Sequence, residues 1–220
     1  LAAQLLGEQP QRFARRAPHR HGRAVLDLGD AVALRVAVFV GDHRHPGQRA
    51  DFDELGVPTV LADLEYPIDH AVKGCEAVIF AAGSGSKTGR DKTVLVDHLG
   101  AIRSMVTARV HNARRYIMLS ATNSDPRSES TIAHYHRAKG HADNHLRETD
   151  LDYTILCPGG LTDAPAGGAT VDPDWHVRGT TSRNLLADAI VACLDLPNTV
   201  GKTFSLLDGD TPLDDALQSL

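Results

Sequence analysis

Apolar strand-like runs alternate with helix-like segments from about residue 56 to the end of the chain. Short runs rich in β-branched and aromatic residues predict strands over 57–63, 76–82, 114–122, 151–158 and 201–209. Apolar residues at helical spacing predict helices over 68–75, 90–112, 130–148, 184–196 and 212–219. This alternation predicts a parallel sheet covered by helices on both faces.

The composition indicates one globular domain over residues 1–220. A chain of this length can bury a full core, and 42% apolar with 23% charged residues is ordinary for a soluble protein. The net charge of −5 gives no reason to expect nucleic acid or an anionic membrane as a partner. The early apolar run "AVALRVAVFV" contains Arg35 and is too short to span a bilayer. Three dispersed cysteines indicate buried thiols in a reducing compartment, so we expect a cytoplasmic protein.

Small or polar residues follow four of the predicted strands. They are Asp63, the stretch "AAG" at 81–83, "SAT" at 120–122 and "PGG" at 158–160. Ligands of parallel sheets bind outside the carboxyl ends of the strands. We therefore expect these four strand ends to form one site.

The stretch "AAGSGSKTG" at 81–89 comes close to the phosphate-binding loop of nucleoside triphosphatases. Ala81 would stand at its first position and Lys87 and Thr88 at its last two, but Ser86 replaces the second glycine. Without that glycine the backbone wraps a phosphate with more difficulty. The alternatives are another kind of nucleotide site and a glycine-rich loop without a ligand.

Tyr135 and Lys139 are four residues apart on a predicted helix, so they share a face. A nearby ammonium group favours the phenolate and is expected to lower the tyrosine pKa. The pair could then donate or accept a proton near neutral pH. The alternative is that both residues lie on the surface of a polar helix.

From about Arg49 onward the chain resembles the atypical short-chain dehydrogenase/reductases, in their bacterial NAD(P)H-binding, NmrA-like branch. The matching stretches are "LADLE", "GCEAVIFAAGSGSKTGRDKTVLVDHLGAI", "RYIMLSA", "HYHRAKGHADNHLRETDLDYTILCPGGLTD" and "PNTVGKTFSLLDGDTPLDDAL". The resemblance implies a Rossmann-like, doubly wound α/β fold that binds NAD or NADP. It also implies hydride transfer between nicotinamide and a small carbonyl, alcohol or quinone-like substrate. The alternative is a sensor of NAD(P) occupancy that does not turn over.

The resemblance implies roles for the residues at the strand ends. Ala81, Ala82 and Gly83 would pass under the ribose and pyrophosphate of the cofactor, since small residues let a ligand approach the backbone. The other implied cofactor contacts are Asp63 by the adenine, Lys87 near phosphate or substrate, Tyr135 and Lys139 at the ribose, and Pro158 and Gly159 at the nicotinamide end.

The implied catalytic residues are Tyr135, Lys139 and Ser120. Family members often carry two serines at the end of the strand that precedes the tyrosine helix, and Ala121 replaces the second one here. Ser120 or Thr122 could supply the hydroxyl group. This departure bears on catalysis more than on cofactor binding.

Residues 1–46 depart from the family more strongly. The family begins with a strand and G-x-x-G-x-x-G, whose glycines bring the pyrophosphate to a helix N-terminus. Residues 1–46 lack this pattern and hold seven arginines and no lysine, for a charge of +3 against −8 for residues 47–220. We hypothesise that 1–46 is not native family sequence, for example after a reading-frame error, and expect its first strand to be absent or irregular. The alternative is a diverged first unit in which "ALRVAVFV" survives as a strand.

Several further properties follow from the sequence as expectations. The region 160–182, with Trp175 and Arg178, is expected to be a loop that covers a small-molecule substrate. We expect a monomer or small homo-oligomer. His141 and His145 are four apart and could pair on a metal, but no further ligand is placed, so no metal site is expected. The choice between NAD and NADP falls near Asp42, Arg44 and Arg49, which compete for the deciding position.

Overall fold

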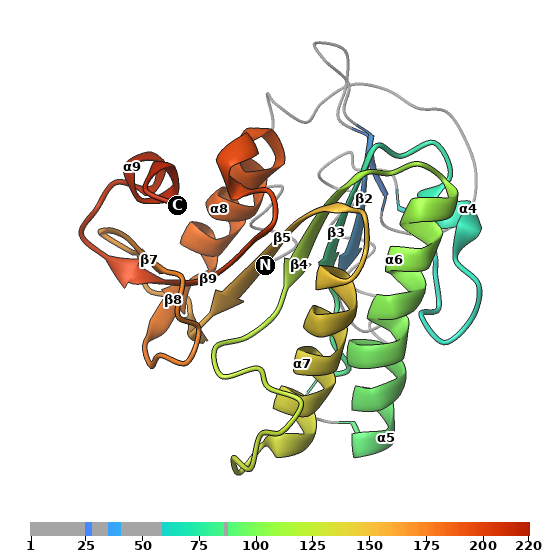
Figure 1. Ribbon diagram of the computed structural model, residues 1–220, viewed down its shortest axis with the longest axis horizontal. Helices are drawn as coiled ribbons and strands as arrows, with labels where there is room; N and C mark the ends of the chain where they lie inside the picture. The colour runs from blue at the N-terminus through green and yellow to red at the C-terminus, as the bar shows by residue number, and fades with distance from the viewer. Residues whose placement is uncertain (1–24, 28–34, 41–58, 86–87) are drawn as a thin grey trace.

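The computed structural model describes residues 25–27, 35–40, 59–85 and 88–220. They form an α/β unit with a twisted central sheet between two layers of helices (Figure 1). The strands are β1 (Val25–Asp27), β2 (Arg35–Val40), β3 (Ala77–Ala81), β4 (Arg115–Leu119), β5 (Asp152–Pro158), β6 (Gly160–Thr162), β7 (Gly168–Asp172), β8 (Thr180–Ser182) and β9 (Lys202–Gly209).

The main sheet has the strand order β1-β2-β3-β4-β5-β9-β7. Strands β2, β3, β4, β5 and β9 are parallel, and β1 and β7 add antiparallel strands at the two edges. Strands β6 and β8 form a separate parallel pair. The predicted Rossmann-like, doubly wound α/β fold is confirmed.

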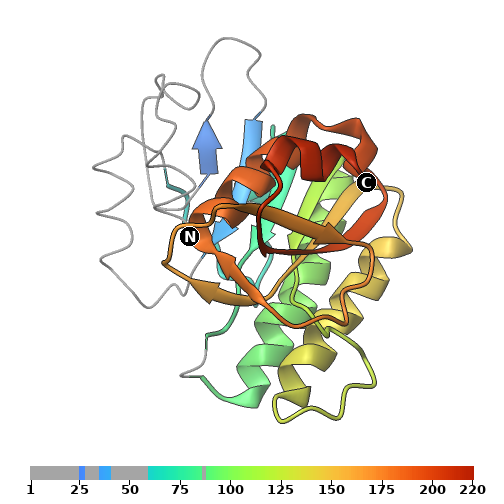
Figure 2. The same ribbon diagram turned by 90° about the vertical axis from the view of Figure 1, so that its left-hand side faces the viewer.

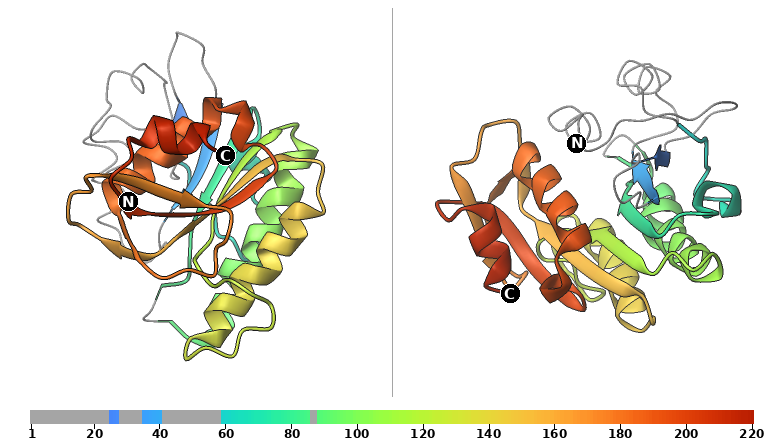
Figure 3. Two further views of the ribbon diagram at one scale, coloured as in Figure 1. Left: turned by 60° about the vertical axis from the view of Figure 1, so that its left-hand side comes forward. Right: turned by 90° about the horizontal axis from the view of Figure 1, so that it is seen from above.

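Helices cover both faces of this sheet, as two views show (Figure 2, Figure 3). One layer comprises α4 (Asp69–Val72), α5 (Arg90–Lys92), the π-helical segment η1 (Thr93–Gly100), α6 (Ala101–Val110) and α7 (Ala133–Arg147). The other comprises α8 (Arg183–Asp195) and α9 (Leu213–Gln218), and a 3₁₀ turn η2 (Pro197–Thr199) precedes β9. No helix among the described residues is long and apolar enough to cross a membrane.

The central strands are apolar on both faces because both faces are covered. On β3, Ala77 and Ile79 pack toward α8 and α9, whereas Val78 and Phe80 pack toward α6 and α7. The same alternation on β4 and β5 completes two hydrophobic cores, one under each helical layer. The continuous apolar runs of the sequence predicted these doubly buried strands.

Two of the sequence predictions are corrected in this layer. No named strand occurs over residues 59–63, which form only a single bridge at Val60; the neighbour of β3 is β2 instead. A β-branched run becomes a strand only where a free edge is available to pair. In the helix predicted over 90–112, Val94, Val106 and Val110 are exposed, so the apolar stripe is not the buried face.

The predicted loop over 160–182 contains β6, β7 and β8 instead. Strand β7 pairs with β9 over five residues, from Gly168 opposite Gly209 to Asp172 opposite Ser205. Its glycines hid the strand from the sequence pattern. Gly168 and Gly209 both lie against backbone, where an added Cβ would come within 2.5 and 2.2 Å of neighbouring atoms.

Two strands lie within residues 1–46, where we expected none that is regular. Strand β2 is regular and pairs in parallel with β3 from Val36 opposite Ala77 to Val40 opposite Ala81. This corrects the expectation for Arg35–Val40 and agrees with the alternative that "ALRVAVFV" supplies a strand. The remainder of 1–46 lies outside the described residues, apart from β1.

Candidate functional site

The carboxyl ends of three parallel neighbours, β3, β4 and β5, lie at one edge of the sheet. This arrangement brings together the predicted residues 81–83, 120–122 and 158–160. Hydrogen bonds tie the ends to one another, since Ser120 N–H donates to Leu156 O and Thr122 N–H to Pro158 O. Helix α7 begins beside this edge and carries the Tyr–Lys pair.

Lys139 lies under the ends of two strands rather than at the surface. Its side chain is almost fully buried, and Nζ donates hydrogen bonds to Ala82 O at 3.4 Å and Leu119 O at 3.2 Å. The ring of Tyr135, one turn earlier on α7, has its centroid 5.9 Å from Nζ. Tyr135 is half-buried, and its hydroxyl has no hydrogen-bond partner among the described residues. The alternative of two surface residues is therefore wrong for Lys139.

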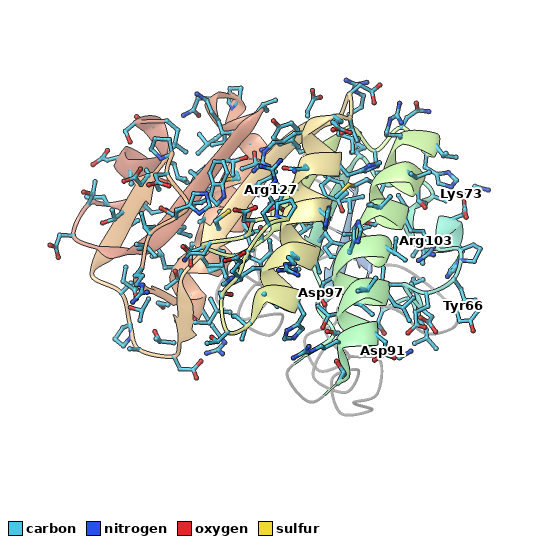
Figure 4. All side chains as sticks on the ribbon, turned by 60° about the horizontal axis from the view of Figure 1, so that its bottom comes forward. Tyr66, Lys73, Asp91, Asp97, Arg103 and Arg127 are labelled. Carbon is cyan, nitrogen blue, oxygen red and sulfur yellow. The ribbon has the colours of Figure 1, made fainter. Side chains whose placement is uncertain are left out.

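Asp97 completes the environment of Lys139 from the neighbouring helix layer. It lies on η1, on the side that faces α7 (Figure 4). Its Oδ1 is 3.5 Å from Lys139 Nζ, and its Oδ2 accepts a hydrogen bond from Ser84 N–H at 2.9 Å. One buried carboxylate thus ties the loop after β3 to the lysine of α7.

The charge of this pair decides the ionisation of the site. Burial lowers the pKa of Lys139, but Tyr135, Asp97 and Asp143 raise it more, so the net pKa lies above its ordinary value. Burial raises the pKa of Tyr135, and Lys139 only partly offsets this. The expected lowering of the tyrosine pKa is therefore wrong: desolvation outweighs the ammonium charge, and Tyr135 is a protonated phenol at neutral pH.

Ser120 is placed at the end of β4, but its hydroxyl points into the protein. Ser120 is almost fully buried, and its Oγ donates to Asp143 Oδ2 at 2.5 Å. Ser124 donates to the same oxygen at 2.9 Å. Burial raises the pKa of Asp143, against the lowering effect of these two hydrogen bonds.

The residues after β3 fit a flat sugar–phosphate ligand. Ala81 and Gly83 are half-buried and carry at most a methyl group, so a ligand can reach the backbone there. Ala82 is buried against the core. Gly83 has a second constraint, because an added Cβ would lie 3.0 Å from Asp97 Oδ1.

Pro158 and Gly159 end β5 beside the small β6–β8 sheet. An added Cβ at Gly159 would come within 2.2 Å of Gly179 O, and Gly159 N–H donates to Thr181 Oγ1 at 2.9 Å. The glycine is thus required by the approach of the chain itself. A role of Pro158 and Gly159 at the nicotinamide end stays a prediction.

Asp63 and Lys87 differ in how far the structure places them. The carboxylate of Asp63 accepts a hydrogen bond from Glu65 N–H, and its carbonyl accepts one from Tyr66 N–H, so Asp63 begins a turn. This turn lies against the helix layer, where Arg103 donates to Leu64 O. Lys87 lies outside the described residues.

The histidines on α7 and η1 form a ring pair rather than a metal cluster. His98 and His141 stack with centroids 5.2 Å apart. Burial and the neighbouring histidines lower the pKa of His98. Among the described residues, no group of three or more metal-ligating side chains is placed to hold an ion.

Two functional residues, Asp97 and Asp143, were missed from the sequence. Asp97 is a lone acid within "TVLVDHLG", and Asp143 follows Lys139 by one helical turn. Together with Tyr135 and Arg147, the second signal is a spacing of four residues repeated along one face of α7. That spacing could have revealed Asp143, whereas nothing local distinguishes Asp97.

Comparisons with known proteins agree with this architecture. The NAD(P)H-binding family matches residues 20–197, a range that includes β2 and the Tyr–Lys helix. YhfK of Bacillus subtilis (strain 168), described as an uncharacterized sugar epimerase, is 40% identical over 182 residues, which cover 80% of this chain and 85% of YhfK.

Two solved structures are also similar. A Bacillus halodurans protein, described as a candidate NAD-dependent epimerase/dehydratase, has a TM-score of 0.76 and 38% identity, covering 84% of this chain and 87% of its own. The oxidoreductase ylbE of Lactococcus lactis has a TM-score of 0.66 and 31% identity, covering 74% and 77%. Together with the Rossmann-like sheet and its strand-end site, these matches show that the chain belongs to the NAD(P)H-binding family, whose cofactor is NAD or NADP.

Proposed function

We propose that the protein is an NAD(P)H-dependent oxidoreductase that acts on a small carbonyl, alcohol or quinone-like substrate, with Tyr135 as the proton donor. The observation that carries this proposal is the Tyr135–Lys139 pair at the carboxyl edge of the sheet. The phenol is half-buried, and the ammonium is held beneath it by two strand-end carbonyls and Asp97.

When bound, the nicotinamide supplies or accepts the hydride. The protein's own residues have separate tasks. Tyr135 is protonated at neutral pH because burial raises its pKa, which suits donation to a carbonyl oxygen. Lys139 keeps a positive charge close to the phenol, which stabilises the phenolate that forms as the proton leaves. Ala81, Ala82 and Gly83 leave room for the ribose and pyrophosphate. Asp63, Lys87, Pro158 and Gly159 are proposed as further cofactor contacts.

Oxidation of NADPH and NADH against a panel of carbonyls, quinones and sugars tests the proposal. Sugars belong in the panel because YhfK is described as a sugar epimerase. Tyr135→Phe should abolish turnover and leave cofactor binding intact. Tyr153→Phe, at the opposite end of β5, is the matched control and should leave turnover unchanged. Equal turnover by Tyr135→Phe and the wild-type protein would reject the role of Tyr135.

A second function is supported by a specific observation, the internal hydrogen bond of Ser120. Its hydroxyl is committed to Asp143, and Ala121 offers no replacement, so no serine hydroxyl faces Tyr135 from these two positions. A sensor of NAD(P) occupancy would need binding without turnover. Tight cofactor binding with no oxidation on any member of the panel would favour the sensor over the enzyme.

A further inference from the structure

Asp143 is a buried carboxylate outside the Tyr–Lys pair. It lies one turn after Lys139 and one turn before Arg147 on α7, and it is almost fully buried. Its Oδ2 accepts hydrogen bonds from Ser120 Oγ and Ser124 Oγ, and its Oδ1 has no hydrogen-bond partner among the described residues.

A buried carboxylate is costly unless it is well paired or hydrogen-bonded. Among the described residues, no cation lies within ion-pair distance of Asp143: Lys139 pairs with Asp97 instead, and the guanidinium of Arg147 lies 4.9 Å from the Trp175 ring centroid. The direct contacts of Asp143 are therefore the two serines that bracket the loop 120–124. Fixing this loop is the effect that its position and bonding support.

The loop 120–124 in turn holds the segment around Trp175. Asn123 N–H donates to Trp175 O at 2.7 Å, and its side-chain amide donates to Val177 O at 3.1 Å. The indole N–H of Trp175 donates to Ser124 O at 3.2 Å. Asn123 adopts a left-handed conformation with φ of 62°, which reverses the chain so that it can make both contacts.

This segment continues to the wall of the site at β5. Gly179 follows it, and Gly179 O accepts a hydrogen bond from Gly160 N–H at 3.0 Å and lies against Gly159. A path of direct contacts thus runs from Asp143 through Ser124 and Trp175 to the neighbourhood of Gly159. It does not pass through the residues after β3 that fit the sugar and phosphates.

We propose that Asp143 is a positioning residue, which fixes the substrate-side wall of the site through Ser120, Ser124 and Trp175 and leaves the cofactor side unaffected. The assignment of this wall to substrate rests on the proposed function. Its mechanical part does not, because Trp175 can be observed without cofactor or substrate.

Trp175 is the only tryptophan of the chain, so its fluorescence reports on this segment alone. The variants to compare are Asp143→Leu, Asp143→Asn and Ser124→Ala, with Asp150→Asn and Ser130→Ala as matched controls on exposed groups. Far-UV circular dichroism checks that each variant is folded. If Asp143→Leu does not fold, Ser124→Ala carries the test.

Asp143→Leu and Ser124→Ala should shift the Trp175 emission to longer wavelength and raise its acrylamide quenching constant about twofold, as local opening exposes the indole. Asp143→Asn should lie between these and the wild-type protein, because its amide oxygen can still accept both serine hydroxyls. The two controls should show no change. The Kd for NADPH should stay unchanged in all variants.

With any substrate that the panel identifies, Ser124→Ala should raise KM about fivefold at nearly unchanged kcat, the effect of losing one hydrogen bond. Unaltered Trp175 emission in folded Asp143→Leu or Ser124→Ala would overturn the proposal, as would an equal shift in the controls or a weakened Kd for NADPH. If the panel shows no turnover, the proposed function fails, and the fluorescence and NADPH results still decide whether Asp143 positions this wall.

Discussion

At the scale of single residues, burial outweighs charge in setting the chemistry of the site. The phenol of Tyr135 lies close to the ammonium of Lys139, yet its pKa is raised because desolvation dominates. The phenol is therefore suited to donating a proton and not to accepting one at neutral pH. Spacing along a helix predicts proximity, whereas the direction of a pKa shift depends on what surrounds the pair.

Tyr135 is expected to ionise at a higher pH than an exposed tyrosine. Absorbance at 295 nm, compared between the wild-type protein and Tyr135→Phe, isolates its titration. Because its pKa is raised on folding, Tyr135 stabilises the fold below its ordinary pKa, and this contribution is lost as pH rises through the folded value. Stability should thus fall more steeply above about pH 10 in the wild-type protein than in Tyr135→Phe. A difference titration centred below 10 would contradict this.

Gly159 and Gly160 are adjacent but differ in the space that they have. An added Cβ meets Gly179 O at 2.2 Å from Gly159 but at 3.9 Å from Gly160. Gly159→Ala should lower the free energy of unfolding by about 1–3 kcal/mol through overpacking, measured by urea denaturation. Gly160→Ala is the matched control and should change it by less than about 0.5 kcal/mol. Equal effects of the two substitutions would show that this close approach is not rigid.

At the scale of elements, the π-helical segment η1 decides which residues face the site. It turns Thr93, Asp97 and Gly100 inward, and the apolar Val94 and Leu99 are exposed. π-helical turns are frequent at functional sites. Here the turn delivers a carboxylate to the lysine of the neighbouring helix.

The Asp97–Lys139 pair should show strong coupling in a double-mutant cycle. Both side chains are almost fully buried, so removing one charge leaves the other unpaired. Lys139→Met should lower the free energy of unfolding by about 3–5 kcal/mol. The double variant Asp97→Asn/Lys139→Met should be more stable than Lys139→Met alone, as urea denaturation can show. Additive losses would mean that the two groups act independently.

At the scale of the whole molecule, the sheet brings distant segments to one edge. Strand β2 from the atypical first segment pairs with β3, and β7 pairs with β9 at the far edge. The two ends of the sheet thus depend on segments whose sequence patterns are weak. The site lies between them, at the ends of β3, β4 and β5.

The chain should bind NAD(P) at least about tenfold more weakly than a relative with an intact glycine fingerprint, a loss of about 1.4 kcal/mol. The reason is that residues 1–46 lack the G-x-x-G-x-x-G pattern that lets a pyrophosphate reach a helix N-terminus. Calorimetric titration of both proteins with NADH and NADPH measures the difference. Submicromolar affinity of this chain would contradict the prediction. Sequencing the coding DNA around codon 46 would test the reading-frame hypothesis.

The sequence by itself determined the elements whose patterns are local. The doubly apolar runs of β3, β4 and β5, the closing Gly74 after α4 and the spacing of Tyr135 and Lys139 all depend on neighbours within a few residues. Periodicity and turn chemistry are sufficient there. The strand ends that form the site edge follow from the same pattern, because parallel strands end on one side.

Only the tertiary structure decided the rest, because pairing and desolvation depend on residues far apart in the chain. Strand β7 exists because β9 offers an edge, while residues 59–63 form only a bridge and β2 pairs with β3. The charge state of Tyr135, the pairing of Lys139 with Asp97 and the capture of the Ser120 hydroxyl by Asp143 arise where α7, η1 and the strand ends meet. No local pattern encodes these contacts.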